Sequence, residues 1–340
     1  MAVKHKSSFS LYDDEDPEEQ EPIVKKVKEV EKNLPTQSSV SQESIDTNGE
    51  VIKYKYPLFF VMGCRRGERD EMEDAHICLP SFNTHDPQIV SRSSLYAILD
   101  GHGGSRAATY CASNIPSTLT KLVSQYKTLE GLEKGMKKIK TELYKTMDDG
   151  FLKEARSNKP AWKDGTTATT LYLLNDVFYV GNIGDSKAIV CRKKDDKEVI
   201  IELTVDHNPL KYEERQRIMK AGGVVKNGRI DGIIEVSRSI GDGQFKTRGI
   251  TCLPDMKKFT LTEHDQFILV ACDGLWKSFT NEEAVQYIWK LLKDTEKKED
   301  IMVRGKKAQW EEVASEMAAE AVRRRCGDNV SLLILVIHSI

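Results

Sequence analysis

The chain has 340 residues, of which 39% are hydrophobic and 31% charged, a balance typical of a protein with a sizeable core and a charged surface. Its 51 basic and 53 acidic residues give a net charge of -2, which argues against a nucleic-acid-binding protein because such proteins carry a basic excess. No stretch approaches the roughly 18 apolar residues of a membrane span, no signal peptide is visible, and the seven cysteines contain no CxxC pair. These features predict a cytoplasmic or nuclear protein that does not associate with membranes.

Residues 1–54 differ in composition from the rest of the chain. They contain an acidic run at 13–19, a lysine cluster at 25–28 and a Ser/Gln/Thr-rich stretch at 36–47. A segment with many charges and few aromatics cannot bury enough apolar area to offset the entropy of ordering, so we predict a disordered tail. The lysine cluster is either a nuclear import signal or, more simply, a solvated run of charge.

Residues 55–340 have the pattern of a folded domain. Short apolar or β-branched runs bounded by Gly, Asp or Asn predict strands at 58–62, 95–99, 167–174, 177–183, 188–191, 267–271 and 331–338. Amphipathic spacing predicts helices at 105–126, 129–155, 211–221, 282–293 and 310–325. Because strands and helices do not alternate regularly, this order favours an α+β fold with antiparallel sheets and helices on the outside.

Acidic residues stand where several predicted strands begin or end. Asp100 and Asp273 each follow a strongly apolar run directly, and Asp328 lies just before another. Glu73 and Asp74 follow an arginine-rich turn. Taken alone, each Asp-Gly pair is more simply a hairpin turn. The end of a buried strand holds a side chain in a fixed position, so the five acids are better explained together, as a site that faces a cleft.

Carboxylates gathered in one site repel one another and need cations. All-oxygen ligation selects hard ions such as Mg²⁺ or Mn²⁺, and two such ions about 3.5–4 Å apart can activate water near neutral pH. The sequence contains no Cys-x5-Arg loop, and the motifs GxxxxGK[ST], GxGxxG, HExxH and GxSxG are also missing from it. Metal-assisted hydrolysis is the chemistry that remains.

Nine motifs, in order along the chain, resemble those of the metal-dependent protein phosphatases of type 2C. They lie at 68–76, 99–104, 164–168, 181–188, 203–209, 221–223, 236–242, 271–276 and 327–331. The resemblance covers roughly residues 58–340. It implies a four-layer α-β-β-α fold, in which a central sandwich of two antiparallel sheets is flanked by helices. It also implies a protein serine/threonine phosphatase in which metal-activated water attacks phosphoserine or phosphothreonine without a phosphoenzyme.

The resemblance assigns metal ligands by position. One Mn²⁺ or Mg²⁺ ion would be held by Asp100, Asp273 and Asp328. The second would take Glu73, Asp100 and the backbone carbonyl of Gly101, with Asp74 supporting it through water. Asp100 would bridge the two ions and so take part in catalysis.

Two further residues match catalytic positions of the family. Arg69 matches the phosphate-binding arginine, and a planar bidentate donor suits two phosphate oxygens. His102 matches the general acid that protonates the departing serine or threonine oxygen. The simpler interpretations are a surface arginine in a charged cluster and a histidine in a glycine-rich turn.

One departure from the family pattern concerns a third ion. Family members often carry an aspartate four residues after the position of Asp273, where it helps the residue matching Asp185 bind a third metal. Here that position is Lys277. Either the third ion binds weakly through Asp185, or the charge of the lysine replaces part of the role of the ion.

Two alternative functions remain open. The first is a catalytically inactive phosphatase-fold scaffold that acts in protein interactions. Such relatives usually lose a metal carboxylate, and here all of them are present. The second is another two-metal hydrolase, such as a phosphodiesterase, which only a comparison of substrates separates. The expected partners are phosphoprotein substrates and kinase-signalling proteins, and nothing requires more than a monomer.

Overall fold

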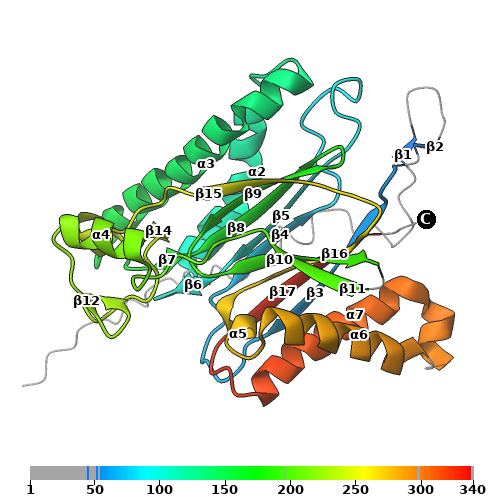
Figure 1. The fold of residues 1–340 in the computed structure, drawn as a ribbon. Helices are drawn as coiled ribbons and strands as arrows, with labels where there is room; N and C mark the ends of the chain where they lie inside the picture. The colour runs from blue at the N-terminus through cyan, green and yellow to red at the C-terminus, as the bar shows by residue number, and fades with distance from the viewer. Residues whose placement is uncertain (1–43, 46–50, 53, 196, 297–298, 338–340) are drawn as a thin grey trace, which may run out of the picture. The chain divides into compact units, whose positions relative to one another are not determined.

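The computed structural model describes residues 44–45, 51–52, 54–195, 197–296 and 299–337 (Figure 1). The chain divides into two units, Met1–Lys53 and Tyr54–Ile340. In the first unit, β1 (Ser44–Ile45) and β2 (Val51–Ile52) form an antiparallel pair. The remainder of the predicted disordered tail up to residue 53, including the lysine cluster, lies outside the described residues.

Two five-stranded antiparallel sheets form the centre of the second unit (Figure 1). The first has the order β15-β9-β8-β5-β4 and contains β4 (Ala75–Leu79), β5 (Ser93–Leu99), β8 (Ala168–Leu174), β9 (Val177–Ile183) and β15 (Asp255–Thr260). The second has the order β11-β10-β16-β17-β3 and contains β3 (Leu58–Arg65), β10 (Lys187–Lys194), β11 (Lys197–Glu202), β16 (Asp265–Ala271) and β17 (Val330–Ile337).

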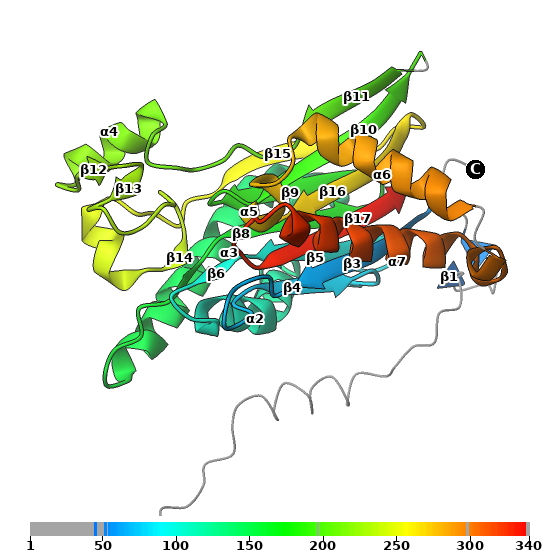
Figure 2. The same ribbon diagram turned by 90° about the horizontal axis from the view of Figure 1, so that it is seen from below.

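Helices cover the outer faces of both sheets (Figure 2). The first sheet packs against α2 (Arg106–Val123) and α3 (Leu129–Ser157), and the second packs against α6 (Asn281–Glu296) and α7 (Glu299–Arg323). This arrangement confirms the predicted α+β fold with a central sandwich of antiparallel sheets between helices. Among the described helices, none combines the length and apolar character needed to cross a bilayer.

Residues of the central strands alternate between two cores. In β5, Tyr96 and Ile98 pack between the two sheets, whereas Leu95 and Leu99 pack beneath α2 and α3. Strands β16 and β17 divide their side chains in the same way between the inter-sheet core and the core under α6 and α7. Burial of each large apolar side chain contributes roughly 1.5–3 kcal/mol, so these strands are held on both faces. Their ends are therefore rigid mounts for functional side chains.

Shorter elements extend the fold beyond the sandwich. A three-stranded sheet of order β14-β7-β6 joins β6 (Gly101–His102), β7 (Gly165–Thr166) and β14 (Ile240–Gly241). The connection from β11 to β15 contains α4 (Tyr212–Lys220), β12 (Val225–Lys226), β13 (Arg229–Ile230), β14 and the 3₁₀ helix η1 (Gly243–Arg248). We call residues 205–255 the α4 segment. The short helix α5 (Asp273–Trp276) follows β16.

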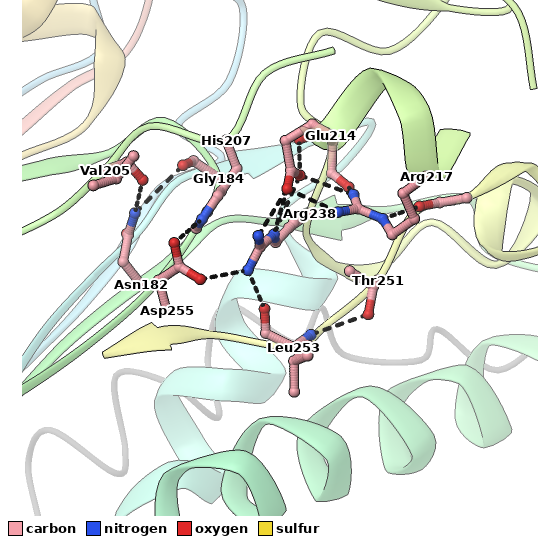
Figure 3. A network of polar contacts seen from close by, with 12 residues as sticks. Asn182, Gly184, Val205, His207, Glu214, Arg217, Arg238, Thr251, Leu253 and Asp255 are labelled. Atoms are coloured by element: carbon pink, nitrogen blue, oxygen red, sulfur yellow. Dashed lines mark hydrogen bonds and ion pairs between the residues drawn. The ribbon is translucent and has the colours of Figure 1, made fainter. Parts of the chain in front are cut away.

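A polar network centred on the buried Glu214 joins the α4 segment to Asp255, the first residue of β15 (Figure 3). The carboxylate of Glu214, 4% exposed, accepts hydrogen bonds from the guanidinium groups of Arg217 and Arg238. Arg238 also donates to Asp255 at the start of β15, at 2.8 Å, and His207 contacts the other oxygen of Asp255 at 3.0 Å. The network therefore holds the segment that carries β14.

The structure corrects several predicted boundaries. The helix predicted at 310–325 begins at Glu299, and its backbone is interrupted at Gly305, where φ is +82°. The strand predicted at 167–174 begins at Ala168, and Thr167, which donates its N–H to the carbonyl of Asp100, separates it from β7. Strands β4, β11 and β15 were not predicted. All three are edge strands with at most one fully buried position each, so they contain no long apolar run.

Candidate metal centre and active site

Carboxylates from three separate strand ends converge in the structure. Asp100 follows β5, Asp185 follows β9 and Asp273 follows β16. One ligand oxygen of each lies within 4.8 Å of those of the other two. The convergence that the sequence alone could not show is therefore present for these three acids.

Asp74 joins the same cluster from the other side of Asp100. Ligand atoms of Asp74, Asp100 and Cys272 lie within 4.8 Å of one another. Both carboxylate oxygens of Asp74 are buried, and within the described part of the chain neither makes a hydrogen bond of normal geometry. A buried carboxylate without such a partner requires a cation or a proton.

Burial and mutual repulsion raise the pKa values of the clustered acids. Burial raises the pKa of Asp74 to about 6, although contacts with Ser331 and Cys272 act to lower it, and the charges of Asp328 and Asp273 add to the rise. Burial raises the pKa of Asp185 to about 7, and the charge of Asp273 adds to the effect. The pKa of Asp100 lies well above its usual range for the same two reasons. The cluster therefore favours the uptake of positive charge.

The donor set fits hard divalent cations. Its oxygen donors are those that Mg²⁺ and Mn²⁺ prefer. The neighbouring thiol of Cys272 is fully buried, and burial raises its pKa well above the usual range. A thiol that stays protonated is a poor metal ligand, so Cys272 does not make the site selective for softer metals.

Glu73 and Gly101 meet through the backbone. A side chain at Gly101 would overlap the carbonyl oxygen of Glu73, so glycine is what permits this close approach. The N–H of Glu73 donates to Oδ1 of Asn329 at 2.8 Å. The side chain of Glu73 is not a member of either group of converging acids.

Asp328 and Arg69 lie together at the rim of the cluster. A terminal nitrogen of Arg69 is 3.0 Å from Oδ2 of Asp328, and the arginine side chain is 53% exposed. Nζ of Lys277 contacts the same Asp328 oxygen at 2.8 Å and Oδ2 of Asp273 at 2.6 Å. Asp328 is therefore joined to the converging acids through Lys277.

His102 is paired with an acid to which the sequence assigned no role. Its Nε2 atom lies 2.7 Å from Oδ2 of Asp242, which also accepts a hydrogen bond from Ser239 at 2.6 Å. Burial acts to lower the pKa of His102, but the charge and hydrogen bond of Asp242 outweigh it and leave the pKa raised. A Cβ at Gly165 would overlap both members of the pair, so glycine is required there.

Asn329 is a second residue that sequence reasoning missed. Its side-chain amide donates to the carbonyls of Arg66 and Glu71, at 2.8 and 2.9 Å, while its oxygen accepts from Glu73. These contacts fix the 66–73 turn against the start of β17. The only sequence signals for Asp242 and Asn329 were that both lie inside matching motifs, at 236–242 and 327–331, and that Asn329 stands beside Asp328.

Comparison with known proteins gives concordant results. The family model described as "Protein phosphatase 2C" matches residues 59–330. The human "Integrin-linked kinase-associated serine/threonine phosphatase 2C" is 43% identical over 280 residues, which cover 80% of this chain and 70% of that protein. The "Probable protein phosphatase 2C 8" of Arabidopsis thaliana is 34% identical over 284 residues, covering 80% and 76% of the two chains.

A solved structure supports the fold independently. The serine-threonine phosphatase 2C from Toxoplasma gondii superposes with a TM-score of 0.67 at 17% identity, covering 84% of this chain and 96% of that chain. At this level of identity, the similarity concerns the fold alone.

Proposed function

The chain belongs to the protein phosphatase 2C family and is a metal-dependent protein serine/threonine phosphatase, and we propose that its acidic cluster is the catalytic centre. The observation that carries this proposal is the convergence of Asp100, Asp185 and Asp273 from three strand ends. Structural roles alone do not explain why a fold would gather buried like charges there, because such a cluster is unstable without cations.

We propose that the cluster holds two Mn²⁺ or Mg²⁺ ions. Asp100, Asp273 and Asp328 would hold one, and Glu73, Asp100 and the carbonyl of Gly101 would hold the other, with Asp74 in support. When bound, such ions supply Lewis-acid activation of water and neutralise charge on the phosphate. A third ion would bind only weakly through Asp185, because Lys277 stands beside Asp273.

The other proposed roles belong to side chains around the cluster. Arg69 would bind the phosphate of the substrate, since its guanidinium is half exposed and stands next to Asp328. His102 would donate a proton to the departing serine or threonine oxygen, which leaves poorly as an alkoxide. Asp242 favours the protonated imidazole that this task requires, and it fixes the ring against β7.

The test of this function compares substrates and metals. The purified protein should hydrolyse a phosphothreonine peptide with Mn²⁺ and stop when EDTA is added. A phosphodiester should be turned over far more slowly under the same conditions. Diester turnover at a comparable rate would contradict the assignment to phosphomonoesters, and a folded protein that is inactive with ample Mn²⁺ would favour the scaffold function.

The family implies phosphoprotein substrates. The relatives' name, integrin-linked kinase-associated phosphatase, supports the proposal that this chain also acts in kinase signalling. We further propose that residues 55–340 form the catalytic domain of a monomer in the cytoplasm or nucleus. The seven free cysteines are consistent with such a reducing compartment.

A further inference from the structure

Lys277 bridges two carboxylates of the proposed metal centre. It lies one turn after Asp273, at the end of α5, so the i,i+4 spacing places the two side chains next to each other. Its ammonium nitrogen is 2.6 Å from Oδ2 of Asp273 and 2.8 Å from Oδ2 of Asp328. A single cationic side chain thus joins the end of β16 to the start of β17.

Negatively charged side chains outnumber positively charged ones around the cluster. The carboxylates of the cluster are those of Asp74, Asp100, Asp185 and Asp273, with Asp328 joined to them through Lys277. Among the described residues, the basic side chains within 4 Å of any of these oxygens are Lys277 and Arg69. Of the two, only Lys277 touches one of the acids that converge with Asp100. It is therefore the principal counter-charge that the protein itself supplies.

We propose that Lys277 is a built-in counter-ion of the cluster, one that stabilises the metal-free protein and weakens divalent-ion binding at Asp273 and Asp328. The inference rests on the proposed function, in which these acids hold a metal. A metal ion would need carboxylate oxygens of Asp273 and Asp328 that already accept charge-assisted hydrogen bonds from Lys277. The positive charge of the lysine also repels the ion. Binding must therefore displace the lysine.

The side chain is suited to such displacement. It is 41% exposed, and its four-carbon stem can carry the ammonium into solvent. The carboxylates of Asp273 and Asp328 are 19% and 17% exposed, so they stay in place when the lysine leaves. The lysine is thus the movable partner, and its departure is part of the free energy of metal binding.

The test measures Mn²⁺ binding and thermal stability in Lys277→Met. Methionine matches the length of the lysine stem, lacks the ammonium and its charge, and offers only a soft sulfur that Mn²⁺ does not favour. Calorimetric titration with Mn²⁺ gives affinity, and melting in EDTA and in Mn²⁺ gives stability. Lys293→Met, on an exposed position of α6, is the matched control.

We expect Lys277→Met to bind Mn²⁺ at least about threefold more tightly than the wild type, and to melt several degrees lower in EDTA. Lys293→Met should match the wild type in both. A salt bridge with a purely structural role would lower the melting temperature without raising the affinity for Mn²⁺, and that outcome would overturn the inference. A wild type that binds no Mn²⁺ would contradict the metal centre itself, and with it this inference.

Discussion

The Nε2 atom of His102 lies 2.7 Å from Oδ2 of Asp242, and this contact links β6 to the residue that follows β14. Asp242 is 2% exposed and belongs to the α4 segment. Of that segment, only the last residue, Asp255, is part of a main sheet. Activity is therefore expected to depend on how that segment is fastened, as well as on the acids at the strand ends.

The first prediction concerns Asp242→Asn. The amide no longer favours the protonated imidazole, so we expect kcat for a phosphothreonine peptide to fall about 10- to 100-fold. The loss should be smaller for 4-nitrophenyl phosphate, because nitrophenolate leaves without a proton. Steady-state kinetics on both substrates measures the difference. An equal loss on both would show that Asp242 does not act through proton donation, and Asp149→Asn, exposed on α3, serves as the control.

A second prediction concerns the network around Glu214. Burial acts to raise its pKa, but hydrogen bonds from Arg217, Arg238 and Ser237 outweigh burial and hold the pKa well below its usual range. Glu214→Gln leaves Arg217 without its charged partner and leaves Arg238 with Asp255 alone, so the free energy of unfolding should fall by about 3–5 kcal/mol at pH 7. Urea unfolding measures this loss. The α4 segment should also become more sensitive to limited proteolysis.

The pH dependence of this loss has a definite sign. Because the folded pKa of Glu214 is depressed, its contribution is present above the unfolded pKa of about 4.3 and is lost as the pH falls below it. The stability difference between wild type and Glu214→Gln should therefore shrink in acid. Glu213→Gln, the exposed neighbour on α4, should stay close to the wild type throughout. Equal effects of the two variants would contradict the importance of the network.

The third prediction concerns Lys140, a lysine of α3 that is 0% exposed. Its ammonium donates to the hydroxyl of Thr170 at 2.8 Å, and no carboxylate of the described residues lies within ion-pair distance. Burial lowers its pKa to about 7. Lys140→Met removes a buried ionisable group, so the variant should melt several degrees above the wild type at pH 7.

The advantage of Lys140→Met should decline as the pH rises. A depressed pKa makes the folded wild type bind fewer protons than its unfolded chain between about pH 7 and 10.5, so wild-type stability gains over this window. Melting curves of both proteins from pH 7 to 10 measure the trend. Lys138→Met, exposed on the same helix, should show no such trend. A constant difference between Lys140→Met and the wild type would contradict the assigned pKa.

The sequence predicted the centre of the fold better than its edges, for a physical reason. Strands such as β5, β16 and β17 are buried on both faces and appear as unbroken apolar runs. Edge strands such as β11, with the sequence KEVIIE, carry exposed charged residues and lack that signal. Boundaries set by tertiary contacts, such as the break at Thr167, have no local signature.

The site divides in a similar way. Asp100 and Asp273 were predictable because each directly follows a buried strand. Asp242 and Asn329 act through partners 140 and 256 residues away in the sequence, His102 and Glu73, and only the folded chain reveals such pairs. Lys277 was recognised as a departure from the family pattern, yet its bridge between Asp273 and Asp328 required the structure.

The most direct test of the metal centre is the hydrolysis of a phosphothreonine peptide by wild type and Asp273→Asn, each with Mn²⁺ and with EDTA. We expect wild-type turnover that requires Mn²⁺, and a fall of at least about 100-fold in the variant, because the cluster loses one of its proposed charged ligands. Asp149→Asn should retain full activity, and circular dichroism should show that all three proteins are folded. A folded Asp273→Asn with wild-type activity would contradict the assignment of this cluster as the catalytic centre.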